Sequence, residues 1–198
     1  MAIDDIRADI AYVKDIVGDD NGARKRGGVW MTVAGVVFAL TSVLVWWLLS
    51  NKLISGWGIA GVWLGGSVVC QAIAIPLAGR LPKRSAMSGR ALYAAGAAIG
   101  MTSGSLFLAT VIAVLVTKNY AIWAMFPSII LACYGSFWSI SAAVTKEKWQ
   151  VGVAAGSFIA ATFFTAISMR LESLLVFAVC LLVLAAAPGV VLLRTKSV

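Results

Sequence analysis

The sequence contains no histidine and few acidic residues, and both shortages exclude common kinds of chemistry. Its 198 residues include 0 His, 3 Cys and 8 Asp or Glu. Histidine is a frequent haem ligand and the usual acid–base and metal-binding group near neutral pH. The sequence also lacks a glycine-rich phosphate loop, a nucleophile elbow and zinc-ligand spacing. We therefore predict that the chain is not an enzyme and has no catalytic residue, no cofactor and no metal site.

Charged residues of either sign are also scarce, and they occur in short clusters. They make up 12% of the chain, whereas hydrophobic residues make up 61%, and an ordinary soluble domain carries about a quarter charged residues. The clusters separate six apolar stretches, each long enough for the about 20 helical residues that cross a bilayer core. We predict an all-α, polytopic membrane protein with six transmembrane helices in three hairpins, at residues 29–50, 55–79, 91–116, 120–144, 149–169 and 173–193.

The positions of the basic residues predict how these helices are oriented. Only Lys52, Lys118 and Arg170 of the 16 Lys and Arg residues fall on one side of the predicted membrane. Cytoplasmic segments carry the excess of Lys and Arg. We therefore expect a bacterial-type inner (plasma) membrane location with both termini, including the tail 194–198, in the cytoplasm. Because this topology accounts for the net charge of +8, we expect no nucleic-acid partner.

The N-terminal segment has an apolar stripe of its own. Residues 1–18 are expected to form a cytoplasmic amphipathic helix, and residues 19–28 a charged linker. Spacings of three and four residues place five side chains on one face of the helix: Ile3, Ile6, Ile10, Val13 and Val17. Two heptads form a marginal helix in water, so the stripe needs a cover. The cover is its own bundle, a second subunit or a separate protein partner.

Glycines recur four residues apart on three of the predicted helices. In lipid, helices associate through close backbone approach, which small residues permit. We predict helix-packing faces at these positions, with a subunit interface and a substrate path as the open alternatives. The glycines are Gly61 and Gly65, then Gly96, Gly100 and Gly104, and finally Gly152 and Gly156.

Polar residues inside the predicted helices are few. Gln71, with Ser67 and Ser103, is a possible polar path, and the ordinary alternative is hydrogen bonding between helices. Pro76 and Pro127 are candidates to kink their helices and open a local cavity. No Asp, Glu, Lys or Arg falls within a predicted membrane core, which argues against a proton-coupled transporter.

Two functions fit this pattern. The leading interpretation is a non-enzymatic membrane protein that acts through protein contacts, as an accessory, scaffold or sensor subunit. Its expected surroundings are the lipid bilayer and either further copies of the chain, in a homo-oligomer, or a membrane protein partner. The alternative is an oligomeric small-solute channel or uniporter.

Overall fold

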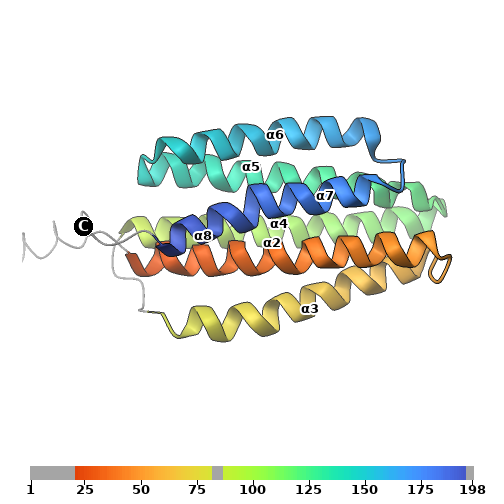
Figure 1. The fold of residues 1–198 in the computed structure, drawn as a ribbon, viewed down its shortest axis with the longest axis horizontal. Coiled ribbons are helices and arrows are strands. Elements are labelled where there is room, and N and C mark those ends of the chain that lie inside the picture. Colours follow the sequence, from red (N-terminus) through yellow and green to blue (C-terminus); the bar gives the residue numbers. More distant parts are fainter. Residues whose placement is uncertain (1–20, 82–86, 195–198) are drawn as a thin grey trace, which may run out of the picture.

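The computed structural model describes residues 21–81 and 87–194, and these are helical almost throughout (Figure 1). The prediction of six helices long and apolar enough to cross a membrane is confirmed. They span Gly22–Ser50, Trp57–Gly79, Gly89–Thr117, Tyr120–Thr145, Lys148–Ile167 and Ser173–Arg194. The predicted N-terminal helix with its stripe of Ile3, Ile6, Ile10, Val13 and Val17 lies outside the described residues.

The first three spans are single helices, and the later ones are more varied. The single helices are α2 (Asn21–Ser50), α3 (Trp57–Gly79) and α4 (Met87–Thr117). The fourth span begins with the 3₁₀ helix η1 (Tyr120–Met125) and continues as α5 (Phe126–Thr145), and the fifth span is α6 (Lys148–Ile167). The last span has three consecutive parts: α7 (Ser173–Leu181), the π-helical segment η2 (Leu182–Ala186) and α8 (Ala187–Arg194).

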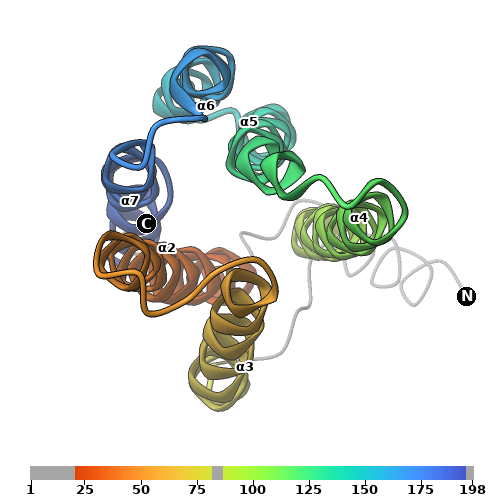
Figure 2. The ribbon, with the colours of Figure 1, turned by 90° about the vertical axis from the view of Figure 1, so that its right-hand side faces the viewer.

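Seen along its length, the bundle is an open ring (Figure 2). The order around the ring is α3, α2, α7 with α8, α6, α5 and α4, and α3 and α4 form its two ends. The most extensive contact between spans joins the last span to α2, and the next joins α5 to α6. The predicted arrangement in three hairpins is not confirmed, because the last span packs mainly on the first helix and touches its predicted partner α6 only slightly.

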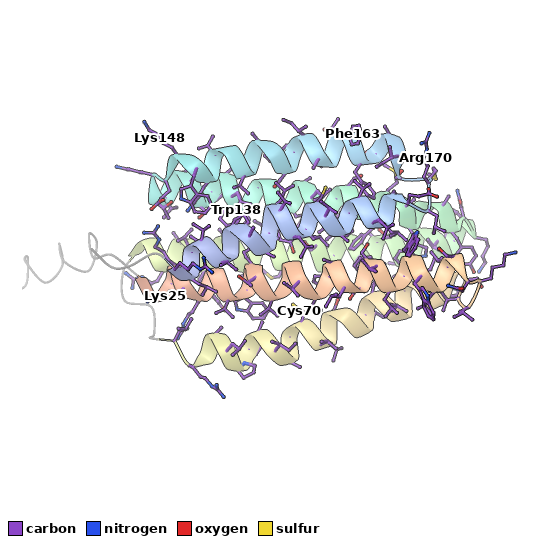
Figure 3. All side chains as sticks on the ribbon, in the orientation of Figure 1. Lys25, Cys70, Trp138, Lys148, Phe163 and Arg170 are labelled. Carbon is purple, nitrogen blue, oxygen red and sulfur yellow. The ribbon has the colours of Figure 1, made fainter. Side chains whose placement is uncertain are left out.

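Charged side chains mark the two ends of the bundle (Figure 3). Lys25 and Lys148 lie at one end, and Arg170 lies at the other, in the connection between α6 and α7. We call these the Lys148 end and the Arg170 end. The prediction that the Lys148 end faces the cytoplasm stays a prediction.

The start of α2 is held against its neighbours by two arginines. The sequence predicts a linker over residues 19–28, whereas residues 21–28 form the first turns of α2. Arg24 Nη2 lies 2.5 Å from Glu147 Oε1 in an ion pair, and Arg26 Nη2 donates to the carbonyl oxygen of Leu81 at 2.6 Å. These contacts tie the segment to the α5–α6 turn and to the end of α3.

Glu147 is the acidic centre of this link. Its Oε2 also accepts a hydrogen bond from Trp149 Nε1 at 2.6 Å. The hydrogen bond from Arg24 holds the pKa of Glu147 below its usual value, and the Trp149 bond acts in the same direction while partial burial opposes both. The carboxylate is thus kept ionised where it joins α2 to the turn.

The tightest helix crossing joins α2 to the last span. A Cβ added to Gly35 would lie 2.5 Å from the backbone nitrogen of Ala186, and one added to Gly189 would lie 2.6 Å from the backbone nitrogen of Thr32. Both distances are far inside van der Waals contact. Backbone meets backbone here because neither glycine has a side chain.

The π-helical segment results from a proline. Pro188 has no N–H, so the carbonyl of Leu184, four residues earlier, loses its helical donor. The helix widens at this point, and the N–H of Ala187 bonds five residues back to Leu182. Trp138, which is fully buried in α5, donates its indole Nε1–H to the Leu184 oxygen at 2.9 Å. One tryptophan therefore satisfies the carbonyl that the proline leaves free.

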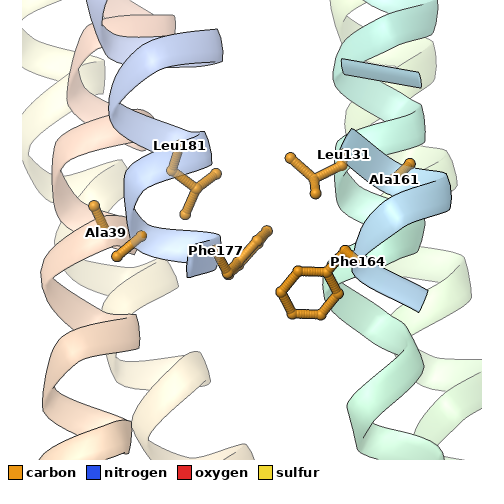
Figure 4. Close-up of a cluster of buried hydrophobic side chains, with 7 residues drawn as sticks. Ala39, Leu131, Ala161, Phe164, Phe177 and Leu181 are labelled. Atoms are coloured by element: carbon orange, nitrogen blue, oxygen red, sulfur yellow. The ribbon is translucent and has the colours of Figure 1, made fainter. Parts of the chain in front are cut away.

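The main hydrophobic core lies between α2, α5, α6 and α7. Its seven buried residues face one another across the inside of the ring (Figure 4): Ala39, Leu131, Ala161, Phe164, Phe177, Ala178 and Leu181. Neither α3 nor α4 contributes a buried residue to this cluster, although Trp63 of α3 packs against it. The two helices at the ends of the ring are thus the least anchored part of the bundle.

Candidate functional site

A cavity of about 860 Å³ lies inside the ring. Every span contributes to its lining, and the lining runs from Trp30 on α2 to Arg170 beyond the end of α6. Pockets that bind small molecules usually measure about 300–1,000 Å³. The cavity is therefore large enough for a molecule that extends along a good part of the bundle.

The wall of the cavity is mainly aromatic and aliphatic. Trp63 on α3 stands between two phenylalanines, with ring centroids 6.1 Å from Phe38 and 6.0 Å from Phe177. Phe177 in turn packs against Phe164 with centroids 5.6 Å apart. All four rings line the cavity. Most of the surface that an occupant would meet is thus apolar.

The ring closes at the Arg170 end through a second aromatic group. Trp57, at the start of α3, makes edge contacts with Tyr120 and Trp123 of η1 at centroid distances of 6.2 and 6.3 Å. Ala60 of α3 and Val114 of α4 are buried with Trp123 in one cluster. Toward the Lys148 end α3 diverges from the other helices (Figure 1), and the cavity is partly open.

The three residues of the possible polar path all line this one cavity. Ser67 and Gln71 come from α3, and Ser103 comes from α4. The hydroxyl of Ser67 donates to the carbonyl of Trp63 at 3.0 Å, whereas the side chains of Gln71 and Ser103 have no hydrogen-bond partner among the described residues. The structure thus brings together three residues that are 36 positions apart at most.

Tyr134 is a further polar residue of the cavity, and the sequence analysis does not include it. It lines the cavity from α5. Its hydroxyl has no hydrogen-bond partner in the part of the chain that the structure describes. The signal available in the sequence is its depth, because tyrosine prefers the membrane surface and this one falls near the middle of the predicted span 120–144.

The predicted glycine faces lie in varied surroundings. Gly96, Gly100 and Gly104 line the cavity, and a Cβ on Gly96 would meet only Phe137, at 3.7 Å. A Cβ on Gly156 would lie 3.3 Å from Leu184, which is a close contact between α6 and the last span. At the other five glycines an added Cβ would have no described atom within 4 Å: Gly61, Gly65, Gly100, Gly104 and Gly152.

The position of the helices in the ring accounts for this difference. Because α3 and α4 stand at the two ends of the ring, Gly61, Gly65, Gly100 and Gly104 have no neighbouring helix beside them. Close helix packing within one chain is therefore not found at these five positions. Gly66 of α3 differs, because a Cβ added to it would lie 2.5 Å from Thr41 Oγ1 of α2. Contact with a second chain at Gly61, Gly65 or Gly152 stays a prediction.

No family model matches the chain, and no curated protein or solved structure matches it. Over residues 21–81 and 87–194, no group of three or more His, Cys, Asp or Glu lies close enough to hold a metal ion. The cavity, with its apolar wall and its few polar groups, is therefore the feature on which a function is proposed.

Proposed function

We propose that this protein is a non-enzymatic membrane protein that binds one elongated, mainly apolar small molecule inside its helix bundle. The single observation that carries the proposal is the cavity of about 860 Å³ with its wall of aromatic and aliphatic side chains. The side chains of such a wall gain dispersion contacts when an apolar molecule lies against them. A lipid-soluble molecule supplies those contacts.

The cavity is partly open, which supports the same proposal. An opening toward the bilayer would let dissolved molecules enter without passing through water. Like the channel alternative, the proposal assigns a small molecule to the protein, but this molecule is mainly apolar. Only a few of the lining side chains are polar, and aromatic walls favour an apolar solute.

The glycines of α4 provide a direct test. A phenylalanine at Gly100 projects into the cavity, and no described atom lies within 4 Å of its Cβ position. Gly152 on α6 is equally free of neighbours but does not line the cavity. Gly100→Phe is therefore expected to fill the site, whereas the matched control Gly152→Phe leaves it open.

Native mass spectrometry of protein extracted in a mild detergent measures the outcome. The wild type and Gly152→Phe are expected to carry one bound molecule of discrete mass, and Gly100→Phe is expected to lose it. Wild-type protein without an adduct, or an adduct retained in Gly100→Phe, would contradict the proposal.

A second candidate function, contact between two copies of the chain, is favoured by the surface of α4. This span is the least buried of the six, with 11% of its most apolar 18-residue segment buried inside the protein. Thr102 and Ser105 are exposed on it, and neither hydroxyl has a partner among the described residues. Hydroxyl groups and small residues in lipid are the usual means by which one membrane helix holds another.

The same mass measurement tests this second candidate. Replacing Thr102 and Ser105 together by leucine should convert dimers to monomers. The control Thr162→Leu should not, because the Thr162 hydroxyl already donates to Phe158 of its own helix at 3.0 Å. Deletion of residues 1–18 tests separately whether the apolar stripe contributes to association. Wild-type protein that is monomeric in its native membrane would exclude this candidate.

A further inference from the structure

The Tyr120 hydroxyl and the Trp123 indole line the cavity at the Arg170 end without a hydrogen-bond partner, and three further polar side chains without a partner line it near the middle of the spans. They are Gln71 of α3, Ser103 of α4 and Tyr134 of α5, and all three line the same space. None of them has a hydrogen-bond partner within residues 21–81 and 87–194. They come from three different helices, and each lies near the middle of its span, so an elongated occupant would pass all three.

Several other hydroxyl groups of the bundle are satisfied by their own helices, whereas Thr102 and Ser105 on the surface of α4 and the buried Thr32 hydroxyl have no partner among the described residues. Ser67, Ser136 and Ser139 each donate to the carbonyl four residues earlier, at 3.0, 3.1 and 2.9 Å. This local bond is common for serine in membrane helices because lipid offers no alternative. The unpaired groups in the cavity are thus placed to bond a molecule that is not part of the chain.

The charge around the cavity restricts what that molecule carries. Arg170 is the one charged residue among the described residues that line it, and it lies at the Arg170 end of the bundle (Figure 3). Gln71, Ser103 and Tyr134 lie within the spans, where no lining side chain is ionic. A carboxylate or a phosphate at this depth would have no counter-ion and would be strongly disfavoured. The polar part of the occupant is therefore neutral.

The hydrogen-bonding groups and the shape of the cavity wall further restrict the class of molecule that the cavity binds. The hydroxyls of Tyr134 and Ser103 and the amide of Gln71 can each donate a hydrogen bond as well as accept one, so a carbonyl group, which only accepts, can bond all three. Gly96 and Gly100 leave the neighbouring surface of α4 without side chains. A flat group can lie against such a surface more closely than against any other side of the cavity.

We infer that the molecule bound in the cavity carries a flat, neutral, carbonyl-bearing ring on an apolar tail, as a substituted benzoquinone does. This inference rests on the proposed function. The ring lies against the glycine surface of α4 and accepts hydrogen bonds from Tyr134, Gln71 and Ser103. The tail follows the aromatic wall past Trp63 and Phe177.

Binding of a decyl-substituted benzoquinone to the full chain in lipid nanodiscs tests the inference. Quinones quench tryptophan fluorescence, and Trp63 lines the cavity. Nanodiscs that carry Gly100→Phe give the baseline for quenching by quinone dissolved in the lipid. The wild type is expected to show a saturable component above this baseline. Dodecylbenzene, which has a ring and a tail but no carbonyl group, is expected to compete only weakly.

Two substitutions on different helices test the polar contacts. Tyr134→Phe and Gln71→Leu are each expected to weaken quinone binding about five-fold, and the double variant more than either, because each removes one hydrogen bond. Neither should change the weak competition by dodecylbenzene. Ser136→Ala is the control, because this residue lies on the same helix as Tyr134 but does not line the cavity. It should leave the Kd unchanged.

The possible failures are distinct. If dodecylbenzene binds as tightly as the quinone and the two substitutions change neither, the bundle binds apolar molecules but the inference about the ring is wrong. Tighter binding of the reduced dihydroxy form than of the quinone would also overturn it, because a hydroxyl group would then be the recognised feature. If neither molecule binds to the wild type, the proposed function fails together with the inference.

Discussion

The two sides of the ring use glycine in opposite ways. On the close-packed side, where α2 crosses η2 and α8, an added Cβ would come within 2.5 Å of backbone at Gly35 and within 2.6 Å at Gly189. On the open side, formed by α3 and α4, a Cβ on Gly61 or Gly100 would have no described atom within 4 Å. The same residue thus permits contact in one place and leaves space in the other.

This contrast separates spacing from packing. Two of the three sets of glycines with the four-residue spacing expected of packed membrane helices lie on the open side, whereas Gly28 and Gly35 on the close-packed side are seven residues apart. What decides the contact is the position of a helix in the ring and the presence of a small residue on the partner. On α4, the glycines of the set line the cavity, whereas those on α3 do not.

The largest difference in stability is expected between a side chain added to a glycine on the close-packed side and one added on the open side. Gly35→Leu should destabilise the protein by about 3 kcal/mol, because the atoms that its Cβ would strike belong to the backbone of Ala186 and cannot move aside. Gly104→Leu should cost less than about 1 kcal/mol, since its Cβ meets open space. Unfolding in mixed detergent micelles measures both. Similar losses at the two positions would remove the distinction between the sides.

A smaller loss of stability is expected on removing the hydrogen bond from Trp138 to Leu184, which lies on the close-packed side. Trp138→Phe leaves the carbonyl of Leu184 without a donor in an apolar setting, at a cost of about 1–3 kcal/mol. The exposed Trp47 is a control whose replacement by Phe should change stability by less than about 0.5 kcal/mol.

A double-mutant cycle sharpens this second test. Pro188→Ala restores the N–H that an α-helix would offer to Leu184, so Trp138→Phe should cost less in that background than in the wild type. The same unfolding assay gives both differences. Equal costs in the two backgrounds would mean that the indole does not replace the missing helical donor.

The smallest effect concerns pH at the Lys148 end. Because Arg24 lowers the pKa of Glu147 in the folded protein, the ionised carboxylate stabilises the fold above the unfolded pKa of about 4.3. That contribution, up to about 1 kcal/mol for a partly exposed pair, is lost as the pH falls through the folded pKa. The Tm difference between the wild type and Glu147→Gln should therefore be full at pH 6 and should shrink below about pH 4. Glu172→Gln, at the Arg170 end, is the control. A difference that stays constant down to pH 2 would contradict the ion pair.

The sequence predicted the spans well, because membrane thickness alone sets their length. The boundaries at Ser50 and Gly79 agree with the prediction. The start of α2 differs, since Arg24 and Arg26 find partners outside the helix and the charged segment can remain helical. The hydropathy of a segment does not show whether its charged residues have partners elsewhere in the fold.

The site was less accessible from the sequence. Gln71, Ser67 and Ser103 stand out as polar residues in apolar runs, but their meeting in one cavity depends on the order of helices around the ring. That order comes from contacts such as Gly35 with Ala186, which no periodicity within one helix reveals. Tyr134 was overlooked because tyrosine is common in membrane proteins and only its depth marks it.

The bond from Trp138 to Leu184 also gives the protein a built-in reporter. The indole proton is fully buried and already bonded, so it should exchange with deuterium only when α5 and the last span move apart. Its exchange rate, followed by NMR as a resolved indole signal, would therefore measure how often the bundle opens on this side. No label or probe needs to be attached to the chain.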